Sequence, residues 1–491
     1  MLHHARGDGG RRERAASRLS VDDRLIGGIE SFYVSYFSLA AAVYVVFGVI
    51  ALIDLVRYRR RVWRADLRAL RSGIGYLPIS ILVPAHNEQK TIVATVRSIL
   101  TLDYPEAEII VIDDGSTDAT LQRLRDAYAL VPVRYAWPAR LRTRPVARAY
   151  CSLEHPSLIV LEKSRGGKSD ALNAGINVSQ YPLFCSLDAD SLLQSDALVR
   201  IARAFAEDER IVAAGGIIRV LNAATVRHGQ VIETHAPRSL LLLAQSQEYL
   251  RGFLTGRTAL GKLGWLLILS GAFTLFRKDA VIEAGGYRTD TVTEDMELIV
   301  RLRRRARERH LPQRIIFLPD PVCWTQIPPD LGSLLSQRDR WHRGLIETIW
   351  MHRAMFLNPR YGAIGLAALP FYVLFEALGP IIELGGYAFT IVLVLLERLD
   401  LAFALTFLGL ALATGLLLSV LALLLDDLLF RRYETARDIA KLMAGSVLEF
   451  FGYRQLLTLR RALAVLSVLD RGRGWGHIRR TAIRPAPGRA A

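Results

Sequence analysis

Two long uncharged stretches flank a middle section of mixed composition. Residues 31–53 carry no charged side chain for 23 positions. At about 1.5 Å per residue, a helix of that length crosses a hydrocarbon layer about 30 Å thick. Residues 401–425 form a second uncharged run, of 25 positions. We therefore predict transmembrane helices over 31–56 and 401–425, and the first is long enough to be a retained anchor and not a signal peptide.

Three further segments near the second run have a more ambiguous pattern. Residues 331–359 alternate apolar and basic faces with a helical period, which predicts interfacial amphipathic helices at the membrane surface. Residues 360–397 are largely apolar but are interrupted by Pro380, so they form either one kinked span or a pair of short elements. Residues 437–468 mix apolar and charged side chains, and this pattern suits a transmembrane or an interfacial segment equally well.

The section from about residue 76 to 330 has the pattern of a soluble α/β domain. Short β-rich runs, ISILVP, EIIVID and LFCSLDAD, alternate with helical stretches such as ATVRSILTL and DALVRIARAFAED. Repeated strand-then-helix units predict a Rossmann-like, mostly parallel sheet whose ligands bind at the carboxyl ends of the strands. Candidate site residues are therefore sought at those strand ends.

Composition supports a membrane protein with a soluble unit. The 491 residues are 51% hydrophobic and 22% charged, with a mean hydropathy of +0.24, which excludes disordered and fibrous classes. The net charge of +16 suits nucleic acid, anionic lipid or a phosphate-bearing substrate. Three cysteines lie far apart without a CxxC pair, which argues against a disulfide framework or a zinc site.

The distribution of arginine predicts the orientation in the membrane. Seven arginines but one aspartate lie between positions 55 and 73, and positive charge beside a span marks its cytosolic side. We expect the α/β domain to be cytosolic, in a multi-pass protein of the cell inner or plasma membrane. The remaining predicted segments are a polar N-terminal segment (1–30), a basic juxtamembrane linker (57–75), the α/β domain (76–330) and a basic C-terminal tail (469–491).

Polar residues follow the first two predicted strands. Pro84, Asn87 and Glu88 end the first strand and open a helix, and Asp113 and Asp114 end the second. Carboxylates at such an edge accept hydrogen bonds from a base or ribose, and helix N-termini favour phosphate. Ordinary turn and helix-cap chemistry is the simpler explanation for either stretch alone. We predict that these residues contribute to a nucleotide site.

Two further stretches suggest a site for a diphosphate. Asp188 and Asp190 follow the strand LFCS, and strand alternation predicts that they project to one face. Paired carboxylates suit Mg²⁺ or Mn²⁺ on a diphosphate, although such a tripeptide is common by chance. Lys163 and Lys168, two of only six lysines, flank a glycine pair, which indicates a point charge near phosphate unless the placement is accidental.

Acidic and aromatic residues mark two later helices. Glu294 and Asp295 follow the probable N-cap Thr293, where acids are favoured by the helix dipole or where Asp295 serves as a general base. Gln337, Arg340 and Trp341 are spaced to share one helix face. Arginine pairs with diphosphate and indole stacks on sugar, but a basic interfacial helix would contain both anyway.

The motifs DDG, DAD, TED and QRDRW, in this order and beside membrane helices, resemble the processive family 2 glycosyltransferases. These include bacterial poly-N-acetylglucosamine, cellulose and hyaluronan synthases. The resemblance covers about residues 76–345 and implies a GT-A fold. It further implies an inverting transfer of sugar, from UDP-GlcNAc or UDP-glucose, to the end of a growing β-linked polysaccharide, which the protein would help to export.

The resemblance also implies roles for individual residues. On the donor side it implies that uridine is held by Asp113 and Asp114, that Lys168 assists at the nucleotide, and that Asp188 and Asp190 bind Mg²⁺ or Mn²⁺ and diphosphate. On the acceptor side it implies Asp295 as the base beside Glu294, with the site closed by Gln337, Arg340 and Trp341. The segment beginning Ser270-Gly271 resembles the acceptor pocket of poly-N-acetylglucosamine synthases.

Two other functions remain open from the residues. One is a non-processive glycosyltransferase with a lipid acceptor, which carries a similar QxxRW motif. The other is a non-catalytic scaffold or transporter, although the retention of every carboxylate argues against it. The expected partners are a UDP-sugar, a polysaccharide acceptor and membrane lipid, without nucleic acid. Because the chain has few membrane helices, an oligomer or export partner chains would complete an export path.

Overall fold

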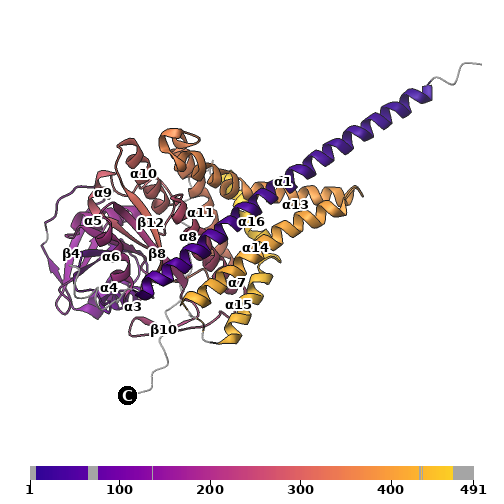
Figure 1. Ribbon diagram of the computed structural model, residues 1–491. Coiled ribbons are helices and arrows are strands. Elements are labelled where there is room, and N and C mark those ends of the chain that lie inside the picture. The colour runs from indigo at the N-terminus through magenta and orange to yellow at the C-terminus, as the bar shows by residue number, and fades with distance from the viewer. Residues whose placement is uncertain (1–6, 65–75, 135, 431–432, 434, 468–491) are drawn as a thin grey trace, which may run out of the picture.

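A mixed β-sheet forms the centre of the α/β section (Figure 1). The computed structural model describes residues 7–64, 76–134, 136–430, 433 and 435–467. Within these residues the main sheet has ten strands in the order β3-β4-β5-β2-β1-β6-β11-β8-β12-β7. Strands β5, β2, β1 and β6 run parallel, β11 is antiparallel between β6 and β8, and β12 is parallel to β8. The strand bounds are β1 Ile79–Ala85, β2 Ala107–Asp114, β3 Leu130–Val133, β4 Val146–Ser152, β5 Leu158–Lys163, β6 Leu183–Leu187, β7 Leu192–Leu193, β8 Ile211–Val220, β11 Phe273–Arg277 and β12 Arg314–Thr325.

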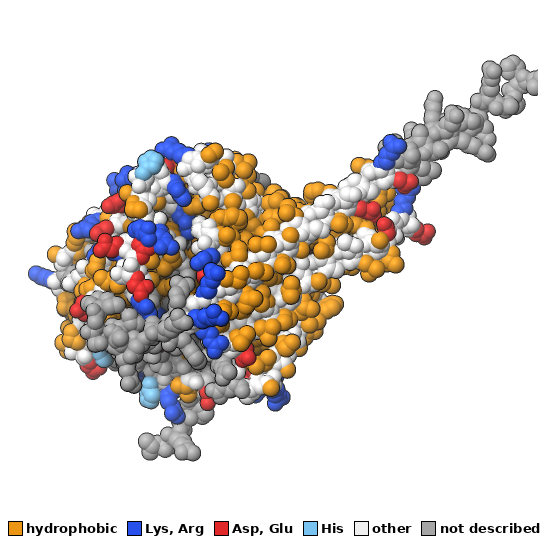
Figure 2. Space-filling view, viewed as in Figure 1, with side chains coloured by type: hydrophobic (Ala, Val, Ile, Leu, Met, Phe, Trp, Pro, Cys, Tyr) orange, Lys and Arg blue, Asp and Glu red, His pale blue; other side chains and the backbone are white. Residues whose placement is uncertain are grey.

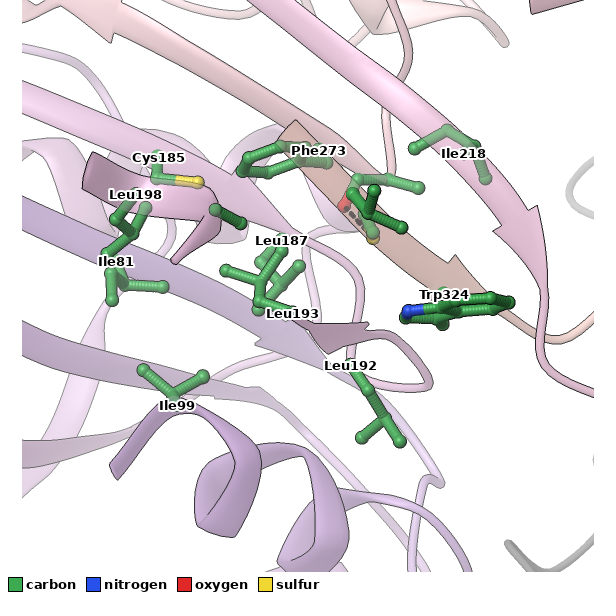
Figure 3. Close-up of a cluster of buried hydrophobic side chains, with 14 of the residues drawn as sticks. Ile81, Ile99, Cys185, Leu187, Leu192, Leu193, Leu198, Ile218, Phe273 and Trp324 are labelled. Carbon is green, nitrogen blue, oxygen red and sulfur yellow. Dashed lines mark hydrogen bonds between the residues drawn. The ribbon is translucent and has the colours of Figure 1, made fainter. Parts of the chain in front are cut away.

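Helices cover both faces of this sheet, which is why its central strands read as continuous apolar runs. Alternate residues of β1 belong to different cores: Ile81 packs with the helices α3, α4 and α6, and Leu82 packs with α5, α9 and α10. Cys185 is fully buried on β6 beside Phe273 (Figure 3). The helix bounds are α3 Ile92–Leu100, α4 Thr120–Tyr128, α5 Lys168–Val178, α6 Ala197–Glu207, α9 Lys278–Glu283 and α10 Glu294–Glu308.

Three helical stretches among the described residues are long and apolar enough to cross a membrane. They are Asp23–Arg60 within α1 (Gly7–Arg64), Ile364–Leu395, and α14 (Leu401–Phe430). Figure 1 shows α1 running alongside α13 (Gly379–Leu395) and α14, away from the sheet. In Figure 2 this face is covered by hydrophobic side chains, whereas charged side chains gather on the α/β domain and at the junction.

The span Ile364–Leu395 is one irregular helical stretch and not two separate elements. It contains two π-helical segments, Ile364–Ala368 and Tyr372–Ala377, followed by α13. Pro380 lies in the first turn of α13, where its missing N–H costs little. The interruption predicted at Pro380 is therefore accommodated within one continuous helical stretch.

Residues 437–468 form two short helices with a sharp break between them. They are α15 (Ala436–Leu448) and α16 (Tyr453–Ser467). Gly452 has a φ of +90° in the connecting turn, a conformation that glycine adopts readily. Each helix is shorter than a membrane-crossing helix, about 20 residues. Most of the juxtamembrane linker (65–75) and the C-terminal tail (469–491) lie outside the described residues.

Helix α11 (Leu331–Met351) connects the α/β domain to the membrane helices. Its N-cap Asp330 accepts a hydrogen bond from Ser333 N at 2.9 Å, which fixes where the helix begins. Its basic residues Arg338 and Arg343 are each 4% exposed. The basic face expected at a lipid surface is therefore packed against protein along much of this helix.

Candidate active site

One cavity of about 1350 Å³ joins the carboxyl ends of the central strands to the membrane helices. It lies where parallel α/β sheets bind their ligands. Its walls come from the loops after β1, β2 and β6, from the start of α10, and from α11. The sequence-predicted residues that line it are Pro84, Asn87, Glu88, Asp114, Lys168, Asp188, Asp190, Ser270, Gly271, Glu294, Asp295, Gln337, Arg340 and Trp341.

Lys168 lies at the centre of a charged cluster in this cavity. Its Nζ is 2.6 Å from Asp188 Oδ1 and 3.3 Å from Glu294 Oε1, and it donates to Gly271 O at 3.2 Å. Burial opposes the charge on Lys168, but the carboxylates of Asp188 and Glu294 outweigh it and raise the pKa of the lysine. The lysine therefore stays charged and joins segments that are far apart in the sequence.

Glu294 and Asp295 begin α10 at the floor of the cavity. Burial raises the pKa of Glu294, and the nearby ammonium of Lys168 opposes this shift. Asp295 Oδ1 accepts from Met296 N at 2.9 Å. A Cβ added to Gly271 would lie 3.0 Å from Lys168 Nζ and 3.2 Å from Asp295 Oδ2. A residue without a side chain at position 271 therefore leaves room for these two charged groups.

The DAD segment lies in a turn and not on a strand as predicted. β6 ends at Leu187, and Ser191 N donates to Asp188 O at 3.0 Å in the turn that follows. The Asp188 side chain is 29% exposed, whereas Asp190 is 2% exposed and its Oδ1 accepts from Thr325 Oγ1 at 3.3 Å. Strand alternation therefore does not explain their arrangement, but the turn still brings both to the cavity.

Asp114 is held by a buried network within the α/β domain. Its carboxylate accepts from Lys163 Nζ at 2.6 Å, from Gly166 N at 2.9 Å and from Gly167 N at 2.7 Å. Lys163 Nζ also lies 2.8 Å from Asp170 Oδ2. These bonds shape the glycine loop that leads into α5. Lys163 thus contacts aspartates at this position, although the sequence suggested a phosphate.

Asp113, like Lys163, does not line this cavity. It is 3% exposed, and its Oδ1 has no hydrogen-bond partner within the described part of the chain. Burial raises the pKa of the Asp113 carboxyl, and hydrogen bonds from Ser116 oppose this shift only in part. A buried acceptor without a partner is costly unless a ligand donates to it.

Asn87 organises the loops after β1 and β2. It has a φ of +58°, and its Oδ1 accepts from Thr117 N at 2.8 Å. Its own backbone N–H donates to Ser116 Oγ at 3.0 Å. Glu88 N donates to Thr120 Oγ1 at 2.9 Å. These bonds hold the two strand-end loops together at one edge of the cavity.

Helix α11 packs closely against the start of α10. A Cβ on Gly344 would overlap the side chain of Thr293, so a glycine is required for this approach. Gln337 is 8% exposed, and its Oε1 lacks a hydrogen-bond partner within the described ranges. Trp341 is 39% exposed and lines the cavity together with Arg340. The helix thus contributes amide, guanidinium and indole groups to the cavity that also contains the acidic cluster.

The cavity continues between the membrane helices, where the sequence contains only a partial signal. Glu376 and Glu383 are acids in a largely apolar stretch, and both line the cavity. Their arginine partners, Arg461 and Arg454, come from α16 and were not predicted. The available signal was the spacing of these two arginines, which are seven residues apart and therefore lie on one face of a helix.

The chain is similar to curated polysaccharide synthases. It is 29% identical over 297 residues to the poly-β-1,6-N-acetyl-D-glucosamine synthase of Staphylococcus aureus strain COL, and the match covers 60% of each chain. It is 30% identical over 277 residues to the synthase of the same name from Staphylococcus epidermidis, covering 55% of this chain and 56% of that one. The match thus spans about 60% of the length of these relatives.

Solved structures are more distantly similar. The mannosyltransferase PcManGT from Pyrobaculum calidifontis, solved with GDP-Man and Mn²⁺, is 19% identical, with a TM-score of 0.47 over 88% of this chain and 99% of that one. The 1–349 portion of Staphylococcus aureus TarS, solved with UDP-GlcNAc, is 15% identical, with a TM-score of 0.36 over 77% and 92% of the two chains.

A family model matches most of the α/β section and α11. The model describes a glycosyltransferase like family 2 and matches residues 77–344, more than half of the chain. Together with the mixed α/β sheet, this match confirms the predicted GT-A-type fold class and the predicted family. The chain belongs to the family 2 glycosyltransferases.

Proposed function

We propose that the protein is a membrane-integrated, inverting hexosyltransferase. It transfers a sugar, N-acetylglucosamine or glucose, from a UDP-sugar to a growing β-linked polysaccharide and helps to export the product. The observation that carries this proposal is the single cavity. It contains Asp295 and the α11 residues at one end, and it continues past Glu376 and Glu383 between the membrane helices.

The charged cluster supports the donor part of this proposal. Asp113 offers a buried, unpartnered oxygen that suits a donor group of the nucleoside. Gln337 and Arg340 line the same cavity as Lys168 and suit hydrogen bonding to diphosphate. The oxygens of Asp114 already accept three hydrogen bonds within the protein. Asp114 therefore contributes to donor binding by holding the glycine loop in place.

The carboxylates also suit a divalent cation. Mg²⁺ is commonly held by one or two carboxylates, water and substrate phosphates, and Asp188 and Asp190 both line the cavity. The described residues contain no group of three acidic, histidine or cysteine side chains that could hold a metal by themselves. Asp188 and Asp190 would hold Mg²⁺ or Mn²⁺, which neutralises charge on the diphosphate leaving group.

Asp295 is the proposed general base. It lies in the first turn of α10 and lines the same cavity as Trp341, on which an acceptor sugar would stack. Ser270 and Gly271 complete this acceptor end. Removal of the hydroxyl proton by the carboxylate would accompany attack on the anomeric carbon, with the nucleoside diphosphate leaving from the opposite side.

The membrane arrangement is part of the same proposal. Three helical stretches are apolar enough to cross a membrane, and arginines concentrate after the first. We place the α/β domain (76–330) in the cytosol, in a multi-pass protein of the cell inner or plasma membrane. An oligomer or export partner chains would extend the membrane part of the cavity into an export path.

The test is transfer by the purified full-length protein in detergent or lipid, supplied with Mg²⁺ or Mn²⁺ and a panel of UDP-sugars. We expect a long polymer from one of these donors. A single-sugar lipid product would support a lipid glycosyltransferase instead, and absence of turnover with every donor would contradict catalysis.

Asp295→Asn should abolish transfer and leave UDP binding nearly intact, because the amide keeps the shape but cannot accept the proton. Transfer is measured by sugar incorporation, and binding by calorimetry with UDP. Asp290→Asn, which alters a mostly exposed carboxylate paired with Arg288, should retain activity as the control. Polymer synthesis by Asp295→Asn at the normal rate would rule out this base.

A further inference from the structure

Helix α16 carries two rows of polar side chains that contact different parts of the protein. Tyr453 and Arg460 are seven residues apart, and so are Arg454 and Arg461. Seven residues correspond to about two turns of an α-helix, so each pair lies along one face. The two rows are one residue apart and therefore face in different directions.

The first row contacts the middle of the QRDRW motif. Arg460 Nη2 forms an ion pair with Asp339 Oδ1 at 3.0 Å. The Tyr453 hydroxyl donates to Glu248 Oε2 at 2.8 Å, and Arg338 Nη2 donates to the same oxygen at 2.9 Å. Glu248 belongs to α7 (Leu240–Leu250). Two motif residues without a role in the proposed chemistry are thus held by α16.

These two motif residues adjoin the residues that face the substrate cavity. Arg338 and Asp339 lie between Gln337 and Arg340 in the helix, and both are buried. The Arg338 guanidinium also lies over the Trp341 ring, 4.3 Å from its centroid. Any rotation of α11 that moved Asp339 would move Gln337, Arg340 and Trp341 with it, because all are on one rigid helix.

The second row contacts the membrane span. Arg454 donates to Glu383 Oε1 at 3.1 Å and to Ala411 O on α14 at 3.2 Å. Arg461 donates to Glu376 O at 3.0 Å and lies 3.3 Å from Glu376 Oε2. Both glutamates line the membrane part of the cavity. Both arginine side chains are 33% exposed, and each also bonds a backbone carbonyl oxygen, which fixes the geometry of its contact with the membrane span.

We propose that α16 positions the QRDRW helix and links its position to the membrane span. Arg460 and Tyr453 act as positioning residues for the motif side chains Gln337, Arg340 and Trp341. Arg454 and Arg461 anchor α16 to the wall of the membrane part of the cavity. This inference rests on the proposed function of the cavity, but it concerns donor binding and can be measured without polymer synthesis.

The test is a double-mutant cycle with Arg460→Gln, Asp339→Asn and the combined variant. UDP affinity is measured by calorimetry, and the KM for the UDP-sugar and kcat are measured by UDP release. We expect each single variant to weaken UDP binding and raise KM, on the order of tenfold. The combined variant should bind UDP no more weakly than the weaker-binding single variant, because both changes break the same contact. The proposal would be overturned if the losses of UDP affinity in the two single variants multiplied in the combined variant, or if Arg460→Gln bound UDP normally.

Two further variants keep the test informative if Arg460→Gln does not fold. Tyr453→Phe removes one hydroxyl and should also raise the KM for the UDP-sugar, with an unchanged thermal transition. Arg461→Gln, on the other row, should weaken UDP binding although its own contacts are with Glu376 and not with the motif. Unchanged UDP affinity in both variants would refute the coupling. If the wild-type protein binds UDP but makes no polymer, the proposed function fails while these affinity comparisons still stand.

Discussion

At the scale of single residues, Asp113 combines burial with an oxygen that has no partner within the described residues. Burial raises the pKa of this carboxyl, so it takes up a proton at a higher pH than an ordinary aspartate. Only the ionised form accepts hydrogen bonds with both oxygens. Donor binding through Asp113 should therefore be sensitive to mild acid.

We predict that UDP affinity falls as the pH is lowered, beginning above the range in which an exposed aspartate titrates. Calorimetric titration with UDP at a series of pH values from acidic to neutral measures this fall in affinity. Asp113→Asn should bind UDP weakly at every pH and should not show the fall at acidic pH. An unaltered pH dependence in this variant would assign the titration to another group.

Gly271 leaves room for the charged cluster. Alanine at this position would place a Cβ 3.0 Å from Lys168 Nζ and 3.2 Å from Asp295 Oδ2, closer than ordinary contact. We predict that Gly271→Ala lowers kcat by roughly ten- to a hundredfold through displacement of these groups. Gly409→Ala, on a helix position with nothing within 4 Å of the added carbon, should keep normal activity. Equal rates for the two variants would contradict this reading of the cavity floor.

At the scale of elements, the contact between α10 and α11 depends on Gly344. A methyl group there would overlap Thr293, immediately before Glu294 and Asp295. We predict that Gly344→Ala destabilises the protein by about 1–3 kcal/mol and lowers transfer, as measured by thermal unfolding and sugar incorporation.

Gly332→Ala provides a matched control within the same helix. Its added carbon would come no closer than 3.5 Å to Asp330 Oδ1, and alanine is favoured over glycine in helices by up to about 1 kcal/mol. This variant should be as stable as the wild type or more so. If both variants behaved alike, close approach of α11 to Thr293 would not be essential.

Local patterns in the sequence were sufficient to locate the strand ends and hence the polar cavity residues that follow β1, β2 and β6. β1, β2 and β6 are buried on both faces, so they appear as apolar runs, and the polar residues that follow them are conspicuous. The role of Asp114 could not be predicted in this way. Its partner Lys163 is 49 positions away, and no periodic pattern reports a contact between two loops.

The end of the chain shows a second limit of pattern analysis. Residues 437–468 have enough apolar content for a span, but Gly452 turns the chain between α15 and α16. The glycine was visible in the sequence, whereas the carboxylate partners of the α16 arginines were not, because each partner lies more than 70 positions before its arginine.

At the scale of the whole molecule, a buried ion pair fixes the sheet to the membrane unit. Arg219 on β8 donates to both carboxylate oxygens of Asp426 on α14, 207 positions away. The side chains are 3% and 0% exposed. A buried charge that loses its partner is strongly unfavourable.

We predict that Arg219→Met lowers the free energy of unfolding by about 3–5 kcal/mol, because Asp426 would remain buried alone. The double variant Arg219→Met with Asp426→Leu should recover much of this loss. Arg314→Met, which removes a surface pair with Asp208, should cost about 0–1 kcal/mol. Denaturation in detergent micelles measures the free energy of unfolding of all three variants. An equal loss of this free energy in the two single variants would show that the buried pair stabilises the protein no more than the surface pair does.

The hydrophobic core of the α/β domain is completed by residues from both membrane flanks. One cluster contains Leu55 from α1 together with Leu423 and Leu425 from α14, packed with residues of β1 and β8. A ribosome makes α14 after the whole sheet, so this cluster is completed only once Leu423 and Leu425 have been synthesised. The α/β domain therefore finishes folding late in synthesis, and residues 76–330 released alone would expose apolar surface and aggregate.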